Sequence, residues 1–224
     1  MTPTTYTIGV TPTPPELDAA WGAGAWAGAQ EGRITHFHEK GSAHRPDTRF
    51  RLLHDNLNIY VQFEVQDRYV RSVQTAYQGS VCTDSCVEFF VQPRPDRGYF
   101  NFEINAGGTL LLFYIEDATR TPNGFAKFGP VAEAWGQQVQ IRHSLPSVVE
   151  PERTEPLTWR IGYRVPVALL EAYTGAQGPL SGQTWRANFY KCGDKTSHPH
   201  WGSWAPITEL NFHLPACFGE LVLQ

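Results

Sequence analysis

Hydrophobic and polar residues alternate along two neighbouring segments in the middle of the chain, residues 84–91 and residues 99–105. Successive side chains of a β-strand point to opposite faces of a sheet, so this pattern predicts two adjacent strands. One predicted face is apolar and belongs to a core. The other face carries these polar residues: Glu88, Asn101, Glu103 and Asn105.

The same period of two recurs along most of the chain, between frequent turn signals. Residues 49–65 predict a hairpin that turns at Asp55 and Asn56, with Ile59 and Phe63 facing inward. Further strands are predicted at residues 109–115, 139–142, 159–165, 185–191 and 218–223. One helical turn is predicted at residues 167–173, after Pro166. Short, regularly spaced strands with 20 Gly and 17 Pro predict an all-β fold, a jelly-roll-like antiparallel β-sandwich.

Long polar stretches separate some of these strands, at residues 68–81, 116–134 and 144–158. We predict that they are loops over the edges and ends of the sheets. With 224 residues, 41% of them hydrophobic, the chain can bury one full core. We therefore predict a single domain spanning residues 1–224.

Charge and composition exclude several classes of partner. A net charge of −4 without basic runs argues against nucleic acid and against an anionic membrane surface. No apolar run reaches the roughly 20 residues that span a bilayer. The first residues lack the features of a signal peptide, so both a cytoplasmic protein and a secreted one whose signal was removed stay open. The oligomeric state is equally open.

A set of short motifs carries a resemblance to a known family. In chain order they are residues 16–21 (ELDAAW), 53–61 (LHDNLNIYV), 84–90 (DSCVEFF), 102–105 (FEIN), 203–204 (SW) and 218–221 (FGEL). Their order resembles that of the family 9 carbohydrate-binding modules, and most closely the free-standing, family 9-like branch. The resemblance spans nearly the whole chain, from about Glu16 to the C-terminus.

The resemblance implies a β-sandwich that binds a sugar or polysaccharide, with structural calcium. Among the acidic residues at loops and strand ends, those best placed to hold calcium are Asp18, Asp55 and Asp67. Carried over by position, Glu88 matches the family's ligand-bonding glutamate, Asn105 its asparagine, and Asn188 an amide-bearing residue. The family's arginine falls at Glu103, and its two sugar-stacking tryptophans fall at Val81 and Phe212.

The residues themselves predict a wider ligand site on the same face. Alternation along residues 185–192 places Arg186, Asn188 and Tyr190 on one side of a strand. If that strand joins the polar face, Arg186 can bridge Glu88 and Glu103. A purely structural layer of polar residues under a loop would give the same sequence pattern. Trp201, next to Gly202, is the predicted stacking surface in place of the missing tryptophan, with Phe212 opposite. The Trp204 side chain is predicted to belong to the core.

An enzymatic function competes with lectin-like binding. Glu88 and Glu103 on adjacent strands are the pair that a glycoside hydrolase would use as catalytic carboxylates. Residues that lie directly cross-strand, however, more often share a proton or an arginine than divide acid and base roles. Carbohydrate binding is therefore the favoured function.

Metal and haem binding have weaker support. The H-x-H pairs at His36 and His198 indicate a metal site only weakly, since a third ligand at a fixed spacing is missing. A structural or haem-type binding domain of the same sandwich architecture stays open as a further alternative. The single methionine, Met1, disfavours a haem with His and Met ligands.

Overall fold

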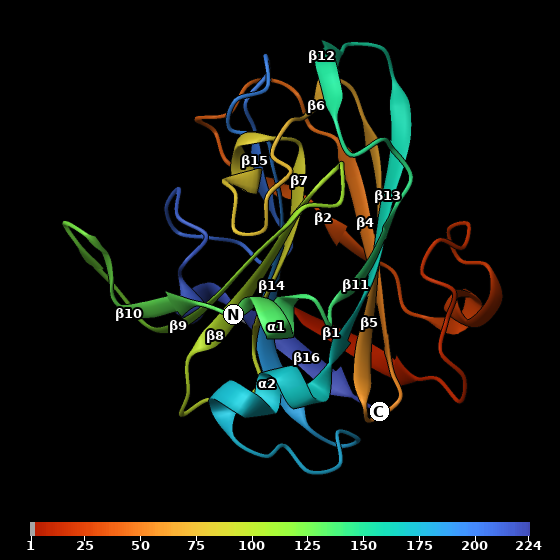
Figure 1. Cartoon of the computed structure of the whole chain (residues 1–224), viewed down its shortest axis with the longest axis vertical. Coiled ribbons are helices and arrows are strands. Elements are labelled where there is room, and N and C mark those ends of the chain that lie inside the picture. The colour runs from red at the N-terminus through yellow and green to blue at the C-terminus, as the bar shows by residue number, and fades with distance from the viewer. Residues whose placement is uncertain (1–2) are drawn as a thin grey trace.

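The computed structural model describes residues 3–224, so Met1 and Thr2 of the predicted domain lie outside the described residues. Two layers of strands pack face to face, and short helices lie at their margins (Figure 1). Among the described residues, no helix combines the length and the apolar character needed to cross a membrane.

Over residues 3–224 the chain forms sixteen strands and five short helices. The strands are β1 (Thr5–Val10), β2 (Gly32–Ile34), β3 (His36–Phe37), β4 (Asp47–His54), β5 (Asn58–Asp67), β6 (Val70–Ser72), β7 (Cys86–Gln92), β8 (Tyr99–Asn105), β9 (Leu110–Thr121), β10 (Gly124–Pro130), β11 (Gln140–His143), β12 (Val149–Arg153), β13 (Leu157–Pro166), β14 (Thr184–Cys192), β15 (Trp201–Ser203) and β16 (Gly219–Leu223). The helices are η1 (Gly24–Gly28), η2 (Val81–Thr83), α1 (Glu133–Gly136), α2 (Val167–Thr174) and η3 (Pro215–Cys217).

Hydrogen bonds link the main strands in the order β10-β9-β8-β7-β14-β16-β1-β4-β5-β13-β11. Strands β10 to β16 along this order form the first layer, and β4 to β11 form the second. Strand β1 joins the layers, because residues 5–8 pair with β16 and residues 9–10 pair with β4. Both of these pairings are parallel. The predicted β-sandwich is confirmed, with parallel pairing at β1 within a largely antiparallel arrangement.

An aromatic core lies between the layers. Phe189 of β14 stacks on Phe50 of β4 with ring centroids 3.7 Å apart, and on Phe89 of β7 at 4.8 Å. The ring of Trp204 meets Phe50 and Phe189 edge-on, at 6.0 and 5.6 Å. Burying each such ring stabilises the fold by about 1.5–3 kcal/mol. The apolar half of the alternating pattern therefore faces the core, as predicted.

Most predicted elements are present, but all three stretches predicted as loops contain strands. Within residues 68–81 and 144–158, β6 and β12 pair with each other. Strands β4 and β5 form the predicted hairpin around Asp55, and α2 begins directly after Pro166. The segment predicted as a loop at residues 116–134 is instead the long β9–β10 hairpin, followed by α1. Its distal part is exposed on both faces, so it carries no hydrophobic alternation that the sequence could reveal.

Candidate functional site

The polar face of the first layer is covered by the chain itself. Residues 205–218, which we call the covering segment, lie over it between β15 and β16. Phe212 of this segment stacks on Tyr190 with ring centroids 4.0 Å apart, and the Tyr190 hydroxyl donates to the Phe212 carbonyl at 2.9 Å. The Tyr99 hydroxyl lies 2.9 Å from Nδ1 of His213. Residues of β8 are buried on this face as well as on the face toward the core.

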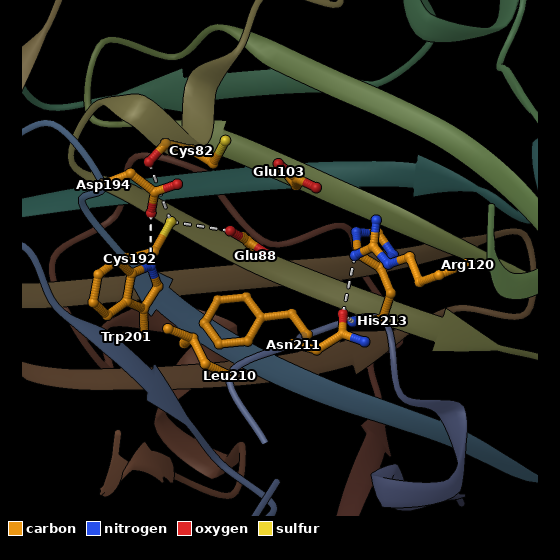
Figure 2. Close-up of a pocket in the computed structure, with 11 residues that line it drawn as sticks. Cys82, Glu88, Glu103, Arg120, Cys192, Asp194, Trp201, Leu210, Asn211 and His213 are labelled. Atoms are coloured by element: carbon orange, nitrogen blue, oxygen red, sulfur yellow. Dashed lines mark hydrogen bonds between the residues drawn. The ribbon is translucent and has the colours of Figure 1, made fainter. Parts of the chain in front are cut away.

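Beside the covering segment, the polar face opens into a pocket of about 220 Å³. Its lining residues are Cys82, Glu88, Glu103, Arg120, Cys192, Asp194, Trp201, Leu210, Asn211, Phe212 and His213. Figure 2 shows Trp201 and Asp194 at one end of this pocket, and Arg120, Asn211 and His213 at the other. The volume is below the roughly 300–1,000 Å³ of drug-sized sites, so the pocket suits a ligand as small as one sugar ring.

Two carboxyl groups form the floor of the pocket. Glu88 on β7 and Glu103 on β8 are direct cross-strand partners, and only 2% and 6% of their surfaces are exposed. Burial and the neighbouring Glu103 raise the pKa of Glu88 well above its usual range. Burial likewise raises the pKa of Glu103 to about 7, against a hydrogen bond of 2.8 Å from Asn101 that favours the ionised form. The pair therefore retains protons at pH values where free glutamate is ionised.

The walls of the pocket combine an indole ring with polar groups. Nε1 of Trp201 donates to the Asp194 carboxylate at 2.7 Å, which fixes the indole ring at the edge of the pocket. The loop that carries Asp194 is itself tied to η2, because the Asp194 backbone N–H donates to the Cys82 carbonyl at 3.0 Å. At the opposite end, Arg120 donates to Asn211 Oδ1 at 3.1 Å. Burial lowers the pKa of His213 to about 3, so its ring is neutral.

Of the predicted ligand residues, the structure places Glu88, Glu103, Trp201 and Phe212 around this one pocket. The remaining predicted residues do not line it and have other partners. Asn101 supports Glu103, and Tyr190 supports the ring of Phe212.

Three predicted ligand residues form hydrogen bonds within the chain instead of lining the pocket. Asn105 donates to the Asp84 carboxylate and to the Gln74 carbonyl, both at 2.9 Å. The amide of Asn188 bonds both backbone groups of Ala205, at 2.9 and 3.1 Å, and so anchors the covering segment. Arg186 donates to the Phe218 carbonyl at 3.0 Å. The predicted bridge from Arg186 to the two glutamates is therefore wrong, because this side chain holds the end of the covering segment.

The rest of the lining is not evident from the sequence. Arg120 lies in the stretch predicted as a loop, and Leu210, Asn211 and His213 lie in a segment without periodicity. Cys82, Cys192 and Asp194 reach the pocket because η2 and the loop after β14 are hydrogen-bonded to each other. Only Cys192 could have been found from the sequence, because strand alternation places Cys86 and Glu88 on one face of their strand and Cys192 on the polar face of its own.

The three aspartates predicted as calcium ligands do not meet. Their carboxylates do not lie within 4.8 Å of one another. Asp67 is held by His44 at 2.7 Å and by Trp159 Nε1 at 3.1 Å, and Asp55 accepts from the backbone of its own turn and from Tyr60. Asp18 is exposed. Calcium prefers six to eight oxygen ligands, so these residues do not form one site, and calcium binding stays a prediction of the family resemblance.

The second of the two histidine pairs, His198 and His200, has structural partners. His200 is buried, donates through Nδ1 to the His198 carbonyl at 2.9 Å and accepts from the Lys191 ammonium at 2.7 Å. Burial and Lys191 lower its pKa to about 3, so it is neutral. His198 stacks on Tyr69 with ring centroids 3.6 Å apart. Both nitrogens of His200 are thus engaged, which disfavours the weak metal interpretation of this pair.

Lectin domains are among the proteins built on two-sheet β-sandwiches of the jelly-roll kind, and a ring-sized pocket of carboxyl, amide and aromatic groups is suited to a small polar ligand such as a sugar. The comparison with protein families agrees: the model of carbohydrate-binding family 9 matches residues 29–223, and the chain belongs to this family. Among curated proteins, no relative matches the chain.

Solved structures show the same fold. A candidate carbohydrate-binding protein from Bacteroides uniformis ATCC 8492 is 28% identical, with a TM-score of 0.84 and 100% of both chains covered. A family 9 carbohydrate-binding module from Caldicellulosiruptor kristjanssonii was solved with glucose, at 13% identity and a TM-score of 0.62 over 98% of this chain and 95% of that one. The same organism's module with cellotriose gives 15% identity and a TM-score of 0.62, over 98% and 93%.

Proposed function

We propose that the pocket between Trp201 and Arg120 binds one ring of a carbohydrate ligand, with Trp201 and Phe212 providing apolar contacts and Glu88 and Glu103 binding hydroxyls. The observation that carries this proposal is the convergence of two carboxyl groups and two aromatic residues on one ring-sized cavity. The apolar C–H faces of a sugar pack on aromatic rings, and its hydroxyls require hydrogen-bonding partners. The family's ligand-bonding glutamate falls at Glu88, which supports the same position.

The shared protons of the carboxyl pair suit such a ligand. A protonated carboxyl donates one hydrogen bond and accepts others, while a carboxylate only accepts. Glu88 and Glu103 together therefore offer both donors and acceptors to the hydroxyls of a sugar. In the relatives from Caldicellulosiruptor kristjanssonii the bound sugars are glucose and cellotriose, so β-glucans are the first candidates for this chain.

A glycan array on the purified protein, read together with reducing-sugar release from the same polysaccharides, tests the proposal. We expect binding to a subset of glycans without release of reducing sugar. Replacing Glu88 by Gln should weaken that binding at least tenfold, which corresponds to about 1.4 kcal/mol. The matched control is Glu64→Gln, because Glu64 is an equally buried glutamate in the second layer, paired with Arg160.

Two results would overturn the proposal. Binding that survives in Glu88→Gln and falls in Glu64→Gln would place the ligand elsewhere. Release of reducing sugar that vanishes in both Glu88→Gln and Glu103→Gln would establish the alternative function, a glycoside hydrolase that uses this carboxyl pair.

A further inference from the structure

Three metal-ligating side chains meet where β7 and β14 pair beside the pocket. Cys86 and Glu88 are two residues apart on β7 and so share a face. Cys192 on β14 is the direct cross-strand partner of Cys86. The Sγ atoms of both cysteines and a carboxylate oxygen of Glu88 all lie within 4.8 Å of one another. Within residues 3–224, this is the one group of three His, Cys, Asp or Glu side chains that meets this criterion.

All three side chains are buried, with exposed fractions of 0–2%. Cys192 Sγ donates to Glu88 Oε1 at 3.0 Å. The surroundings are largely apolar, with Val81 and the partly buried Leu111 packed against the two cysteines. Cysteines that merely fill a core need no carboxyl partner. Here a buried carboxyl group, which is costly to ionise unless it is paired or binds a metal, lies against both of them.

One side of this group is open. Glu88 and Cys192 line the pocket, together with Cys82 and Asp194. Figure 2 shows the Cys192 sulfur and the Glu88 carboxylate facing each other at the floor of that pocket. An ion held by the three side chains would therefore have protein ligands on one side and a free coordination position toward the cavity.

We propose that Cys86, Glu88 and Cys192 bind a thiophilic divalent cation, Zn²⁺, in a three-ligand site whose fourth position faces the pocket. Tetrahedral zinc has Zn–S bonds near 2.3 Å, which places two sulfur ligands roughly 3.8 Å apart. The ligand atoms lie at most 4.8 Å apart here. A small movement of the side chains would bring the two sulfur atoms to the separation that zinc requires. Two thiolates select zinc over calcium or magnesium, which prefer oxygen ligands. This proposal does not rest on sugar binding.

Cobalt is the probe, because Co²⁺ occupies zinc sites and its thiolate complexes absorb in the near ultraviolet. Titration of the reduced, metal-free protein with Co²⁺ should produce this thiolate-to-cobalt absorption, saturating at about one equivalent. Equimolar Zn²⁺ should then remove it. The absorption should vanish in Cys192→Ser and persist in Cys217→Ser, since Cys217 is a free thiol outside the group.

The zinc site would be overturned by a wild-type protein that shows no such absorption, or by an identical spectrum in Cys192→Ser. Circular dichroism establishes whether Cys192→Ser folds. If it does not, Glu88→Gln takes its place, and there we expect at least tenfold weaker Co²⁺ binding with the thiolate absorption retained. Unchanged Co²⁺ affinity in Glu88→Gln would also contradict the proposal. Sugar binding by the metal-free wild type is measured in parallel and reports separately on the proposed function.

Discussion

Glu88 is a single residue whose sheet face can be predicted from the alternation along its strand, although what covers that face cannot. Alternation places Glu88 and Glu103 together on the face opposite the core, and the structure confirms that placement. Neither side chain is freely solvated, because residues more than 100 positions later in the chain cover the same face. Such a contact is set by long-range packing, which local periodicity does not encode.

The first residue-scale prediction concerns the pH dependence of stability. The pKa values of Glu88 and Glu103 are raised in the folded state by burial and, for Glu88, by its partner. At these two carboxyl groups the folded state therefore binds more protons than the unfolded chain above about pH 4.3, so their contribution to stability falls as the pH rises toward 7 and above. Glu103→Gln removes one such group, so this variant should be more stable than wild type at pH 8, by about 1–3 kcal/mol.

Thermal unfolding at pH 5 and pH 8 measures this difference. The amide oxygen of the introduced glutamine can still accept the hydrogen bond from Asn101, so packing is preserved. Glu209→Gln, at an exposed position, is the control and should not change the pH dependence. If the melting temperature changes equally between pH 5 and pH 8 in wild type and in Glu103→Gln, the Glu103 carboxyl group is not held in its protonated form.

Asp67 provides the second residue-scale prediction. Burial alone would raise its pKa, but Lys191 and the hydrogen bond from His44 hold it well below the usual range. Lys191 is itself fully buried, with its Nζ 3.5 Å from Asp67. Asp67→Asn leaves this ammonium without its counter-charge, and removing one partner of a buried pair costs about 3–5 kcal/mol.

Chemical denaturation at pH 7 measures that loss. The matched control is Asp47→Asn, because Asp47 pairs with Arg33 on the surface, where both side chains are nearly half exposed. That change should cost less than about 1 kcal/mol. Equal losses in the two variants would mean that the buried pair contributes no more than a surface pair.

At the scale of elements, the sequence predicts strands well wherever one face is buried. The hairpin of β4 and β5 and the strands β7 and β8 follow directly from their alternation. The distal β9–β10 hairpin escapes prediction because most of its residues are exposed, and its apolar residues, such as Phe125 and Phe128, do not alternate with polar ones. The parallel pairing of β1 with two strands cannot be predicted from the sequence of β1 either, since it depends on where β16 and β4 lie.

The covering segment gives the element-scale prediction. Its beginning is fixed by Asn188, which bonds both backbone groups of Ala205. Asn188→Ala leaves a buried N–H and a buried C=O without these partners, at about 1–3 kcal/mol for each group. We expect a loss of about 2–4 kcal/mol in the free energy of unfolding, measured by urea denaturation.

An exposed asparagine at the β9–β10 turn, Asn123, supplies the control: Asn123→Ala should change stability by less than about 0.5 kcal/mol. If Asn188→Ala proves as stable as wild type yet fails to bind sugar, Asn188 contacts the ligand, as the sequence first indicated, and its anchoring role is secondary.

At the scale of the whole molecule, the order of short motifs along the chain predicts the fold more securely than any single segment does. The family match over residues 29–223 agrees with that order. The pocket is harder to predict, because its lining comes from η2, β7, β8, β9, β14, the loop after β14, β15 and the covering segment. These elements meet only once both layers have assembled, so the sequence identifies the floor of the pocket and one wall but not the opposite end.

Titration calorimetry with cellotriose on wild type, Trp201→Ala and Trp21→Ala tests whether this pocket binds a sugar ring against Trp201. Trp21 is a partly exposed tryptophan stacked with Arg49 and Arg51, and it does not line the pocket. If wild type binds, Trp201→Ala should bind at least tenfold more weakly, about 1.4 kcal/mol, with little change in melting temperature, while Trp21→Ala binds normally. Undiminished binding by a folded Trp201→Ala variant would show that the sugar ring does not bind against Trp201 in this pocket.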